Sequence, residues 1–263
     1  MIEDPKDWTA FKVKLKMKTG IDLNLYKEDQ MKRRISNLVQ RNGFTGFAEY
    51  FDHVALDKEE FASFIEYLTI NVSEFFRTPD KFGKLETEVI PELLQRSPSL
   101  NIWSAGCSIG AEPYSLSIIM KELTPGKKHR ILASDLDIEI LAKAKAGVYL
   151  ENEIKSMSPA RLKKYFVQQE DGRYAVNDEI KKGIEFKRHN LLKDPFEKNF
   201  DLILCRNVVI YFTEEAKKQL YTNFFASLKP GGVLFVGATE AILNFRDMGY
   251  VAYKPFFYQK PLA

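Results

Sequence analysis

The feature that most constrains this chain is the alternation of short apolar runs with helical patterns after Pro98. Five runs have the length and composition of buried strands, namely 100–104, 131–134, 184–187, 201–205 and 233–236. Helical patterns fit between them at 114–123, 138–146 and 214–228. Strands that alternate with helices form a parallel sheet covered on both faces. Two mixed polar and apolar segments near the end, 250–253 and 256–259, suit an antiparallel edge.

The residues before this region follow another pattern. Up to residue 70 the chain carries helical patterns only, at 6–18, 25–41, 45–51 and 57–70. Gly20, Gly43 and Gly46 interrupt them. We therefore expect an all-helical domain at 1–70 and an α/β domain at 99–263, joined by a linker at 71–98.

One segment interrupts the alternation. Between the second and third predicted strands lie about 35 extra residues, and loops of that length are usually functional or separately folded. A helical pattern at 159–166 is followed by turn residues at 170–173, which predict a hairpin. We expect a small inserted subdomain at about 150–182.

The composition excludes several classes of protein. With 45% hydrophobic and 29% charged residues among 263, the chain is neither disordered nor collagenous. No apolar run approaches the roughly 18 residues of a membrane span, and the acidic start lacks the regions of a signal peptide. Cys107, Cys205 and three scattered histidines share no ligand spacing. We expect a cytoplasmic protein without membrane insertion, disulfide framework or bound metal.

Charge is distributed unevenly in the helical region. The net charge of +3 is too small to indicate a nucleic-acid-binding protein. Residues 12–41, however, hold nine Lys and Arg against three acidic residues. Apolar residues at helical spacing leave Lys27, Arg34 and Arg41 near another face of one helix. This basic ridge is either a solvated helix face or a binding surface.

The strongest local motif lies between the first predicted strand and the helix after it. Gly106 and Gly110 stand four residues apart there, and the first strand-to-helix turn is where ligands bind in an open α/β sheet. The spacing is not GxGxxG and no P-loop lysine follows, which disfavours a pyrophosphate cradle. A nucleoside without a phosphate bridge fits better.

Polar residues follow three more predicted strands. Asp135 ends the second strand, where a carboxylate accepts hydrogen bonds from ribose hydroxyls, although Asp135 or Asp137 could instead cap the next helix. Asn190 follows the third strand, and Arg206-Asn207 follow the fourth. Because the carboxyl ends of parallel strands meet at one edge of a sheet, four polar strand ends predict one ligand crevice.

Together these motifs resemble those of the CheR family, the chemotaxis receptor methyltransferases. The resemblance covers nearly the whole chain and rests on Asn71-Val-Ser73-Glu-Phe-Phe-Arg77-Thr-Pro79, Gly110-Ala-Glu112-Pro-Tyr-Ser, Ser134-Asp135, Asn190-Leu191, Cys205-Arg206-Asn207 and Tyr211-Phe212. It implies a Rossmann-like class I S-adenosylmethionine methyltransferase sheet. It also implies a protein-glutamate O-methyltransferase that converts glutamates of bacterial membrane chemoreceptors into methyl esters for sensory adaptation and releases S-adenosylhomocysteine.

The resemblance implies cofactor contacts for individual residues. Glu112 and Asp135 would hold the ribose and methionine parts, and Asn190-Leu191 the adenine. The complete implied set is Asn71, Ser73, Arg77, Gly106, Glu112, Asp135, Asn190, Leu191, Arg206 and Asn207. The first three would close over the cofactor, while the last two would lie near its sulfonium.

Arg77 and Tyr211 are the implied catalytic residues, because they would position the substrate carboxylate. A glutamate with a pKa of about 4.3 is already ionised at neutral pH. Positioning can therefore replace a strong base, and neither cysteine is needed as a nucleophile. The chain departs from the family pattern at Ala111, where a second acidic residue is frequent, and at Ser73, where threonine is common.

The implied partner is the glutamate-rich helical region of a chemoreceptor. The basic residues that would steer and orient an acidic helix are Lys27, Lys32, Arg33, Arg34 and Arg41. The hairpin around Gly172 is shorter and less glycine-rich than in members that dock a receptor's C-terminal pentapeptide, which argues against tethering through such a tail. Two alternatives stay open: a methyltransferase for another acceptor such as RNA or a small molecule, and a non-catalytic adaptor that binds S-adenosylmethionine.

Overall fold

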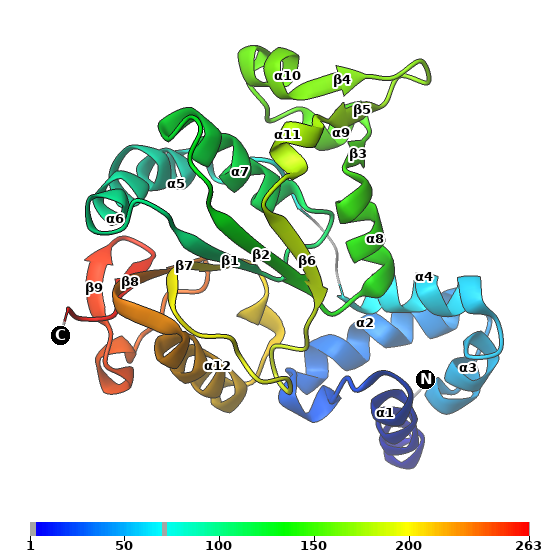
Figure 1. Cartoon of the computed structure of the whole chain (residues 1–263). Helices are drawn as coiled ribbons and strands as arrows, with labels where there is room; N and C mark the ends of the chain where they lie inside the picture. Colours follow the sequence, from blue (N-terminus) through cyan, green and yellow to red (C-terminus); the bar gives the residue numbers. More distant parts are fainter. Residues whose placement is uncertain (1–3, 70–72, 263) are drawn as a thin grey trace. The chain divides into compact units, whose positions relative to one another are not determined.

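The computed structural model describes residues 4–69 and 73–262 and divides into two compact units. The helical unit contains Met1–Ile70 and Val209–Leu220, and the sheet unit contains Asn71–Val208 and Tyr221–Ala263 (Figure 1). Within the described ranges, no helix combines the length and the apolar character needed to cross a bilayer.

Aromatic side chains form the core of the helical unit. Its long helices are α1 (Pro5–Thr19), α2 (Glu28–Arg41), α3 (Phe47–Val54) and α4 (Lys58–Thr69). Phe11 is fully buried, and its ring centroid lies within 6.4 Å of those of Trp8, Phe47, Phe51 and Phe64. Aromatic pairs at such distances contribute roughly 0.5–1.5 kcal/mol each beyond the burial of area. The predicted all-helical pattern is confirmed.

Helix α2 begins three residues later than the sequence predicted. Asp22 instead caps a short 3-10 helix, η1 (Leu23–Leu25). The residues that follow pair with the distant turn η3 (Val209–Tyr211), where the Lys27 N–H donates to the Tyr211 carbonyl at 2.8 Å. The predicted extension of the helix was wrong because this long-range pairing competes with helical hydrogen bonds and leaves no trace in local periodicity.

The described residues of the sheet unit form a seven-stranded sheet in the order β6-β2-β1-β7-β8-β10-β9. The strands are β1 (Asn101–Ala105), β2 (Arg130–Asp135), β6 (Ile184–Arg188), β7 (Phe200–Cys205), β8 (Leu228–Val236), β9 (Val251–Lys254) and β10 (Phe257–Gln259). The first five are parallel to one another, and β10 lies antiparallel between β8 and β9. This arrangement confirms the predicted α/β class and its antiparallel edge.

Helices cover both faces of this sheet, as neighbouring side chains of β1 show. Ile102 belongs to the same hydrophobic cluster as Leu116 of α7 (Ala111–Leu123). Trp103 points to the other face, where its ring lies 5.4 Å from that of Phe224 in α12 (Glu214–Ser227). Figure 1 shows α7 and α12 on opposite sides of the sheet.

Much of the stretch expected to be a linker is helical. It contains α5 (Pro79–Lys84), the π-helix η2 (Leu85–Val89) and α6 (Ile90–Arg96). Phe82, Leu85 and Val89 are buried in the main core of the sheet unit. Sequence reasoning missed these helices because each is short and because proline in a sequence usually indicates a helix break. In α5 and α6 the proline lies in the first turn, where it is tolerated.

The inserted segment folds as a three-stranded antiparallel sheet with short helices (Figure 1). Its elements are β3 (Val148–Tyr149), α9 (Glu151–Ile154), α10 (Pro159–Tyr165), β4 (Phe166–Gln168), β5 (Tyr174–Val176) and α11 (Asp178–Lys181). Strands β4 and β5 form the predicted hairpin, whose Gly172 has a φ of +81°. Arg161 anchors the segment by pairing with Glu86 of η2 and Glu122 of α7, at 2.5 and 2.6 Å. We call residues 148–181 the inserted subdomain.

Candidate active site

The strand order of the sheet reverses at β1. This strand pairs with β2 on one side and with β7 on the other. In open α/β sheets, ligands bind beyond the carboxyl ends of the strands at such a reversal. The residues that follow β1, β2, β6 and β7 therefore form the candidate active site of the sheet unit.

The turn after β1 depends on two glycines. Gly106 has a φ of +84°, and a Cβ added there would lie 2.5 Å from Val208 Cγ2. Gly110 has a φ of +88°, and a Cβ there would lie 3.0 Å from Ala144 Cβ. The Gly106 N–H donates to the Ser134 carbonyl at 2.8 Å. Glycine thus permits the left-handed backbone and lets this turn pack closely against its neighbours.

Backbone groups hold the carboxylate of Asp135 at the end of β2. The Ser108 N–H donates to its Oδ2 at 2.8 Å, and the Asp137 N–H donates to its Oδ1 at 3.2 Å. Burial raises the pKa of Asp135, and these N–H groups oppose the rise. Each carboxylate oxygen keeps acceptor capacity for a further donor, such as a ribose hydroxyl.

Asp137, and not Asp135, caps the helix that follows. The Asp137 Oδ1 accepts from the N–H groups of Glu139 and Ile140, at 2.9 and 3.2 Å. These are the first-turn donors of α8 (Ile138–Ala146), and Asp137 has the extended backbone typical of an N-cap. The structure thereby decides between the two candidates for the N-cap in favour of Asp137.

A buried ion pair lies beside the glycine turn. The side chain of Arg206 is 3% exposed and that of Glu112 is 13% exposed, and their Nη1 and Oε2 atoms lie 3.3 Å apart. The Oε1 of Glu112 accepts from Ser104 Oγ at 2.8 Å. Burial lowers the pKa of Arg206 while Glu112 opposes that change. An arginine stays protonated in proteins, so the pair is ionic.

Arg206 also holds the segment that carries Arg77. Its Nη2 donates to the Arg77 carbonyl at 2.8 Å and to Thr78 Oγ1 at 3.2 Å. Its guanidinium carbon lies 5.0 and 4.6 Å from the ring centroids of Phe82 and Phe235, which are cation–π distances. Three predicted site residues, Arg77, Glu112 and Arg206, are therefore brought together through the contacts of Arg206.

Sequence reasoning missed Glu240, which organises the end of β7. Asn207 has a φ of +61°, and its N–H donates to Glu240 Oε2 at 2.6 Å. The Gly237 N–H donates to the same oxygen at 2.9 Å. Glu240 is 5% exposed. The available signal was its position four residues after the end of β8, where it reaches back to the neighbouring strand end.

Asn190 and Leu191 begin the loop after β6. The Asn190 Oδ1 accepts from the Leu192 N–H at 3.0 Å, and the Asn190 N–H donates to Asp194 Oδ2 at 2.8 Å. Leu191 is buried and apolar. A polar and an apolar surface therefore adjoin here, as the edge and face of a nucleobase require.

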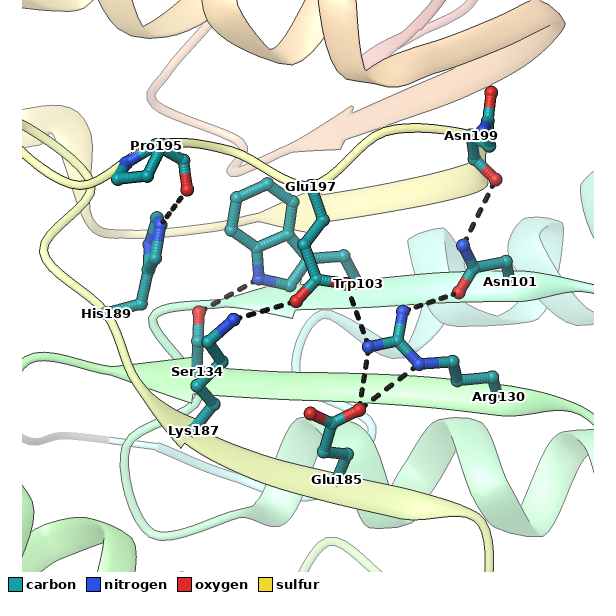
Figure 2. Close-up of polar contacts among 10 residues, drawn as sticks. All are labelled: Asn101, Trp103, Arg130, Ser134, Glu185, Lys187, His189, Pro195, Glu197 and Asn199. Carbon is teal, nitrogen blue, oxygen red and sulfur yellow. Dashed lines mark hydrogen bonds and ion pairs between the residues drawn. The ribbon is translucent and has the colours of Figure 1, made fainter.

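Figure 2 shows His189 directly before this loop, with its Nε2 3.3 Å from the Pro195 carbonyl. Because a carbonyl only accepts, Nε2 carries the proton. The His189 ring lies 5.4 Å from that of Trp103, whose Nε1 donates to Ser134 Oγ at 2.9 Å (Figure 2). Burial lowers the pKa of His189. This histidine looked unremarkable in the sequence, yet its contacts help to hold the loop.

Buried polar atoms without a partner gather at the strand ends. Among the described residues, four buried side-chain polar atoms have no hydrogen-bond partner. Three of them are Ser108 Oγ, His189 Nδ1 and Arg206 Nε, in residues that follow β1, β6 and β7. Buried polar groups are normally paired, so this distribution fits a polar ligand at these strand ends.

The cysteines are not arranged for nucleophilic chemistry. Cys107 and Cys205 are fully buried, and burial raises the pKa of both thiols well above its ordinary value. A reactive cysteine needs accessible thiolate. A covalent cysteine intermediate therefore does not fit this site.

The helical unit contains a cavity of about 500 Å³. It is lined by Gln30, Met31, Arg33, Arg34, Asn37, Tyr67, Ile210 and Tyr211. Arg33 and Arg34, predicted to bind the substrate, thus share one cavity with Tyr211, a predicted catalytic residue that lies far from them in the sequence. We call it the arginine–tyrosine cavity.

Arg34 is not a freely solvated member of the basic ridge. Its Nε and Nη2 donate to the Tyr67 carbonyl at 3.0 and 2.6 Å, and its guanidinium carbon lies 4.0 Å from the centroid of the Tyr67 ring. It therefore caps the last turn of α4. Lys27 is the N-cap of α2, whereas Arg33 and Arg41 are exposed on that helix.

Three of the site residues predicted from the sequence have not yet been placed. Ser73 and Lys32 are half-buried. Asn71 lies outside the described residues.

Comparison with known proteins decides the family. The model of the CheR methyltransferase SAM-binding domain matches residues 71–254, and that of the CheR methyltransferase all-alpha domain matches residues 6–69. The chain belongs to the CheR methyltransferase family. A chemotaxis protein methyltransferase of Listeria innocua is 44% identical over 262 residues, covering 99% of this chain and 100% of the relative. One of Borreliella burgdorferi is 34% identical over 255 residues, covering 92% and 89%.

Membership of the CheR family confirms the methyltransferase class and the S-adenosylmethionine cofactor expected from the sequence. The residues of the sheet unit fit this group. Asp135 offers oriented acceptors for hydroxyls, Leu191 offers an apolar surface, and the unpaired Ser108 hydroxyl lies in the glycine turn. The lack of a phosphate-binding motif also suits a nucleoside that carries a sulfonium.

Proposed function

We propose that this CheR-family protein transfers the methyl group of S-adenosylmethionine to glutamate side chains in the cytoplasmic helical region of chemoreceptors. The observation that carries the proposal is the arginine–tyrosine cavity, which combines Arg33 and Arg34 with the phenol of Tyr211. Guanidinium and phenol groups donate hydrogen bonds to carboxylates. The cavity therefore suits an acidic acceptor, and the names of the chemotaxis relatives support the same substrate class.

Methyl transfer from sulfur to a carboxylate oxygen depends more on the orientation of the reacting groups than on acid–base catalysis. S-adenosylmethionine supplies a methyl group on a positively charged sulfur, and its transfer to a carboxylate oxygen yields a neutral ester and the neutral thioether of S-adenosylhomocysteine. A glutamate with a pKa of about 4.3 needs no base to ionise it at pH 7. Orientation and exclusion of water can lower the barrier by roughly 7–11 kcal/mol.

Arg77 and Tyr211 are the proposed catalytic residues. Both donate hydrogen bonds and neither is required to remove a proton. A tight ion pair with the attacking carboxylate would stabilise the ground state and slow the reaction, because charge disappears as the ester forms. We therefore assign orientation, and not strong binding, to Arg77. The buried guanidinium of Arg206 supports a fixed backbone position for this residue, because it donates to the Arg77 carbonyl and to Thr78 Oγ1.

The cofactor would be held at the strand ends of the sheet unit. Asp135 would accept from the ribose hydroxyls, with Glu112 and Arg206 beside the methionine part and Asn190 and Leu191 beside the adenine. The other proposed contacts are Asn71, Ser73, Arg77, Gly106 and Asn207. The unpaired buried atoms after β1, β6 and β7 support this placement.

The receptor would meet the helical unit at α2. Arg33 and Arg41 are exposed there, and Arg33 also borders the arginine–tyrosine cavity. Lys27, Lys32 and Arg34 would contribute positive potential near the same helix. Arg34 has an additional structural task, because it caps α4.

The decisive experiment uses methyl-labelled S-adenosylmethionine. Receptor-bearing membranes and receptor-free control membranes are incubated with the purified protein and then treated with mild alkali. Release of label as volatile methanol from the receptor-bearing sample alone is the expected result, because carboxyl methyl esters hydrolyse under these conditions. Alkali-stable label would indicate another acceptor. Absence of label from a protein that binds S-adenosylhomocysteine would indicate a non-catalytic adaptor.

A further inference from the structure

The turn that carries Arg77 has an unfavourable backbone conformation. Phe76 has a φ of +49° and Thr78 a φ of +61°, so residues on both sides of Arg77 are left-handed. Neither is glycine, and a bulky side chain in this region is an outlier. Such conformations persist only where surrounding contacts enforce them. The contacts of this turn therefore identify what sets the position of Arg77.

The core of the sheet unit holds one side of the turn. The Phe76 N–H donates to Ser115 Oγ of α7 at 3.0 Å, and Ser115 Oγ in turn donates to the Ala111 carbonyl at 2.7 Å. The Arg77 carbonyl accepts from Arg206. These contacts hold the backbone of residues 76 and 77. The contacts of Phe75 come from another part of the sheet unit.

The inserted subdomain holds the other side. Ser156 Oγ donates to the Phe75 carbonyl at 2.7 Å. The fully buried ring of Phe75 lies 5.0 Å from that of Tyr149 and 5.4 Å from that of Phe166, both at steep angles. All three partners, Ser156, Tyr149 and Phe166, come from the inserted subdomain and lie more than 70 positions from Phe75 in the sequence.

Tyr149 also reaches the glycine turn. Its hydroxyl donates to the Ile109 carbonyl at 2.7 Å, between Gly106 and Gly110. The same side chain therefore touches both the turn after β1 and the segment that carries Arg77. The inserted subdomain thus contacts two elements of the candidate active site through the ring and the hydroxyl of Tyr149.

We propose that the inserted subdomain positions the active site, with Ser156 setting the turn around Arg77 and Tyr149 joining that turn to the glycine turn. Ser156 and Tyr149 are positioning residues, because they act through Phe75 and Ile109. The expected effect on methyl transfer rests on the proposed function. The expected effect on the turn is independent of the proposed function, since it concerns only the backbone of the sheet unit.

Ser156→Ala tests the first part, with Ser158→Ala as the matched control. Ser158 lies two residues away, and its Oγ accepts from the Arg161 N–H as the N-cap of α10. Amide hydrogen exchange in peptides covering 74–78 should be faster in Ser156→Ala than in the wild type and in Ser158→Ala. Ser156→Thr keeps a hydroxyl and should restore slow exchange.

Enzyme kinetics provide the second measurement. Ser156→Ala should lower kcat for receptor methylation roughly three- to tenfold, the equivalent of one lost hydrogen bond. Its Kd for S-adenosylhomocysteine, measured by calorimetry, should stay within about twofold, because the bond acts on the Arg77 turn and not on the strand ends. Tyr149→Phe, which keeps the ring, should instead weaken S-adenosylhomocysteine binding by roughly three- to tenfold through the freed Ile109 carbonyl.

Two results would overturn the proposal. Unchanged exchange at 74–78 in Ser156→Ala would show that the inserted subdomain does not hold the turn. Equal acceleration in Ser158→Ala would show that general loosening of the subdomain, and not the Ser156 bond, is responsible. If the wild-type protein transferred no methyl group, the proposed function would fail, while the exchange experiment would still decide this inference.

Discussion

Two arginines show how differently the two units use positive charge. Arg33 of the helical unit is exposed and borders a cavity, whereas the Arg206 side chain of the sheet unit is 3% exposed and contacts Glu112 and the Arg77 carbonyl. An exposed charge is available to a partner and is screened by salt. A buried charge persists only with compensating partners. Burial, more than residue type, therefore separates the arginine that is accessible to a partner from the arginine that pairs within the protein.

The largest expected effect is that of Arg206→Met on folding. The substitution leaves Glu112 buried without its cationic partner, so the free energy of unfolding should fall by about 3–5 kcal/mol. Urea denaturation of the cofactor-free protein measures this. Adding Glu112→Gln should recover part of the loss, because the two residues are coupled. If Arg206→Met were as stable as the wild type, Arg206 would contribute no more to folding than an exposed arginine does. The contrast between Arg206 and Arg33 would then be wrong.

Arg77 lies between the two extremes, since its side chain is half-buried. Arg77→Ala should lower kcat for receptor methylation about 100-fold, or roughly 2.7 kcal/mol. The Kd for S-adenosylhomocysteine, measured by calorimetry, should change less than about threefold. Arg77→Lys keeps the charge without the planar fork and should be intermediate. A parallel loss of product binding would show that Arg77 acts mainly through its cofactor contact and not by orienting the substrate carboxylate.

Asp135 extends the comparison to a buried negative charge. Its folded-state pKa is raised, so the ionised carboxylate opposes folding of the cofactor-free protein as the pH rises through that pKa. Ribose hydroxyls donate to the ionised form, so affinity for S-adenosylhomocysteine should fall as the pH is lowered through the same pKa. Asp135→Asn should weaken binding by roughly tenfold or more and remove this pH dependence.

Calorimetry from pH 7.5 downward provides the measurement, with Asp137→Asn as the control because that residue caps α8. A pH profile that persists unchanged in Asp135→Asn would assign the titration to another group.

The smallest expected effect is that of Arg33→Glu on receptor recognition. Receptor methylation at low salt should fall by roughly fivefold, about 1 kcal/mol, because one exposed charge is reversed. The loss should shrink as salt rises. Lys198→Glu reverses an exposed charge in the sheet unit and serves as the control. Equal losses in both variants would mean that net charge, and not the position of Arg33, governs recognition.

Local patterns predicted the parts of the fold that depend on neighbouring residues. The alternation after Pro98 predicted the parallel sheet, and the motif that contains Gly106 and Gly110 predicted a strand-to-helix turn after β1. The prediction that α2 starts at residue 25 was wrong, because pairing with η3 overrides the local pattern. The helices between residues 79 and 96 were missed because each is too short for a clear local pattern, and their apolar residues are buried only by the core of the sheet unit.

The amino-acid sequence by itself determined the α/β class, the helical N-terminal region, the glycine turn and the family, because periodicity and motif spacing are local properties. Only the tertiary structure decided that Asp137 is the cap, that Arg34 closes the end of α4 and that Glu240 holds Asn207. It also decided that the Ser156 hydroxyl donates to the Phe75 carbonyl, next to the turn that carries Arg77. Hydrogen bonds and burial depend on which distant groups meet, and a residue's chemical type does not specify its partner.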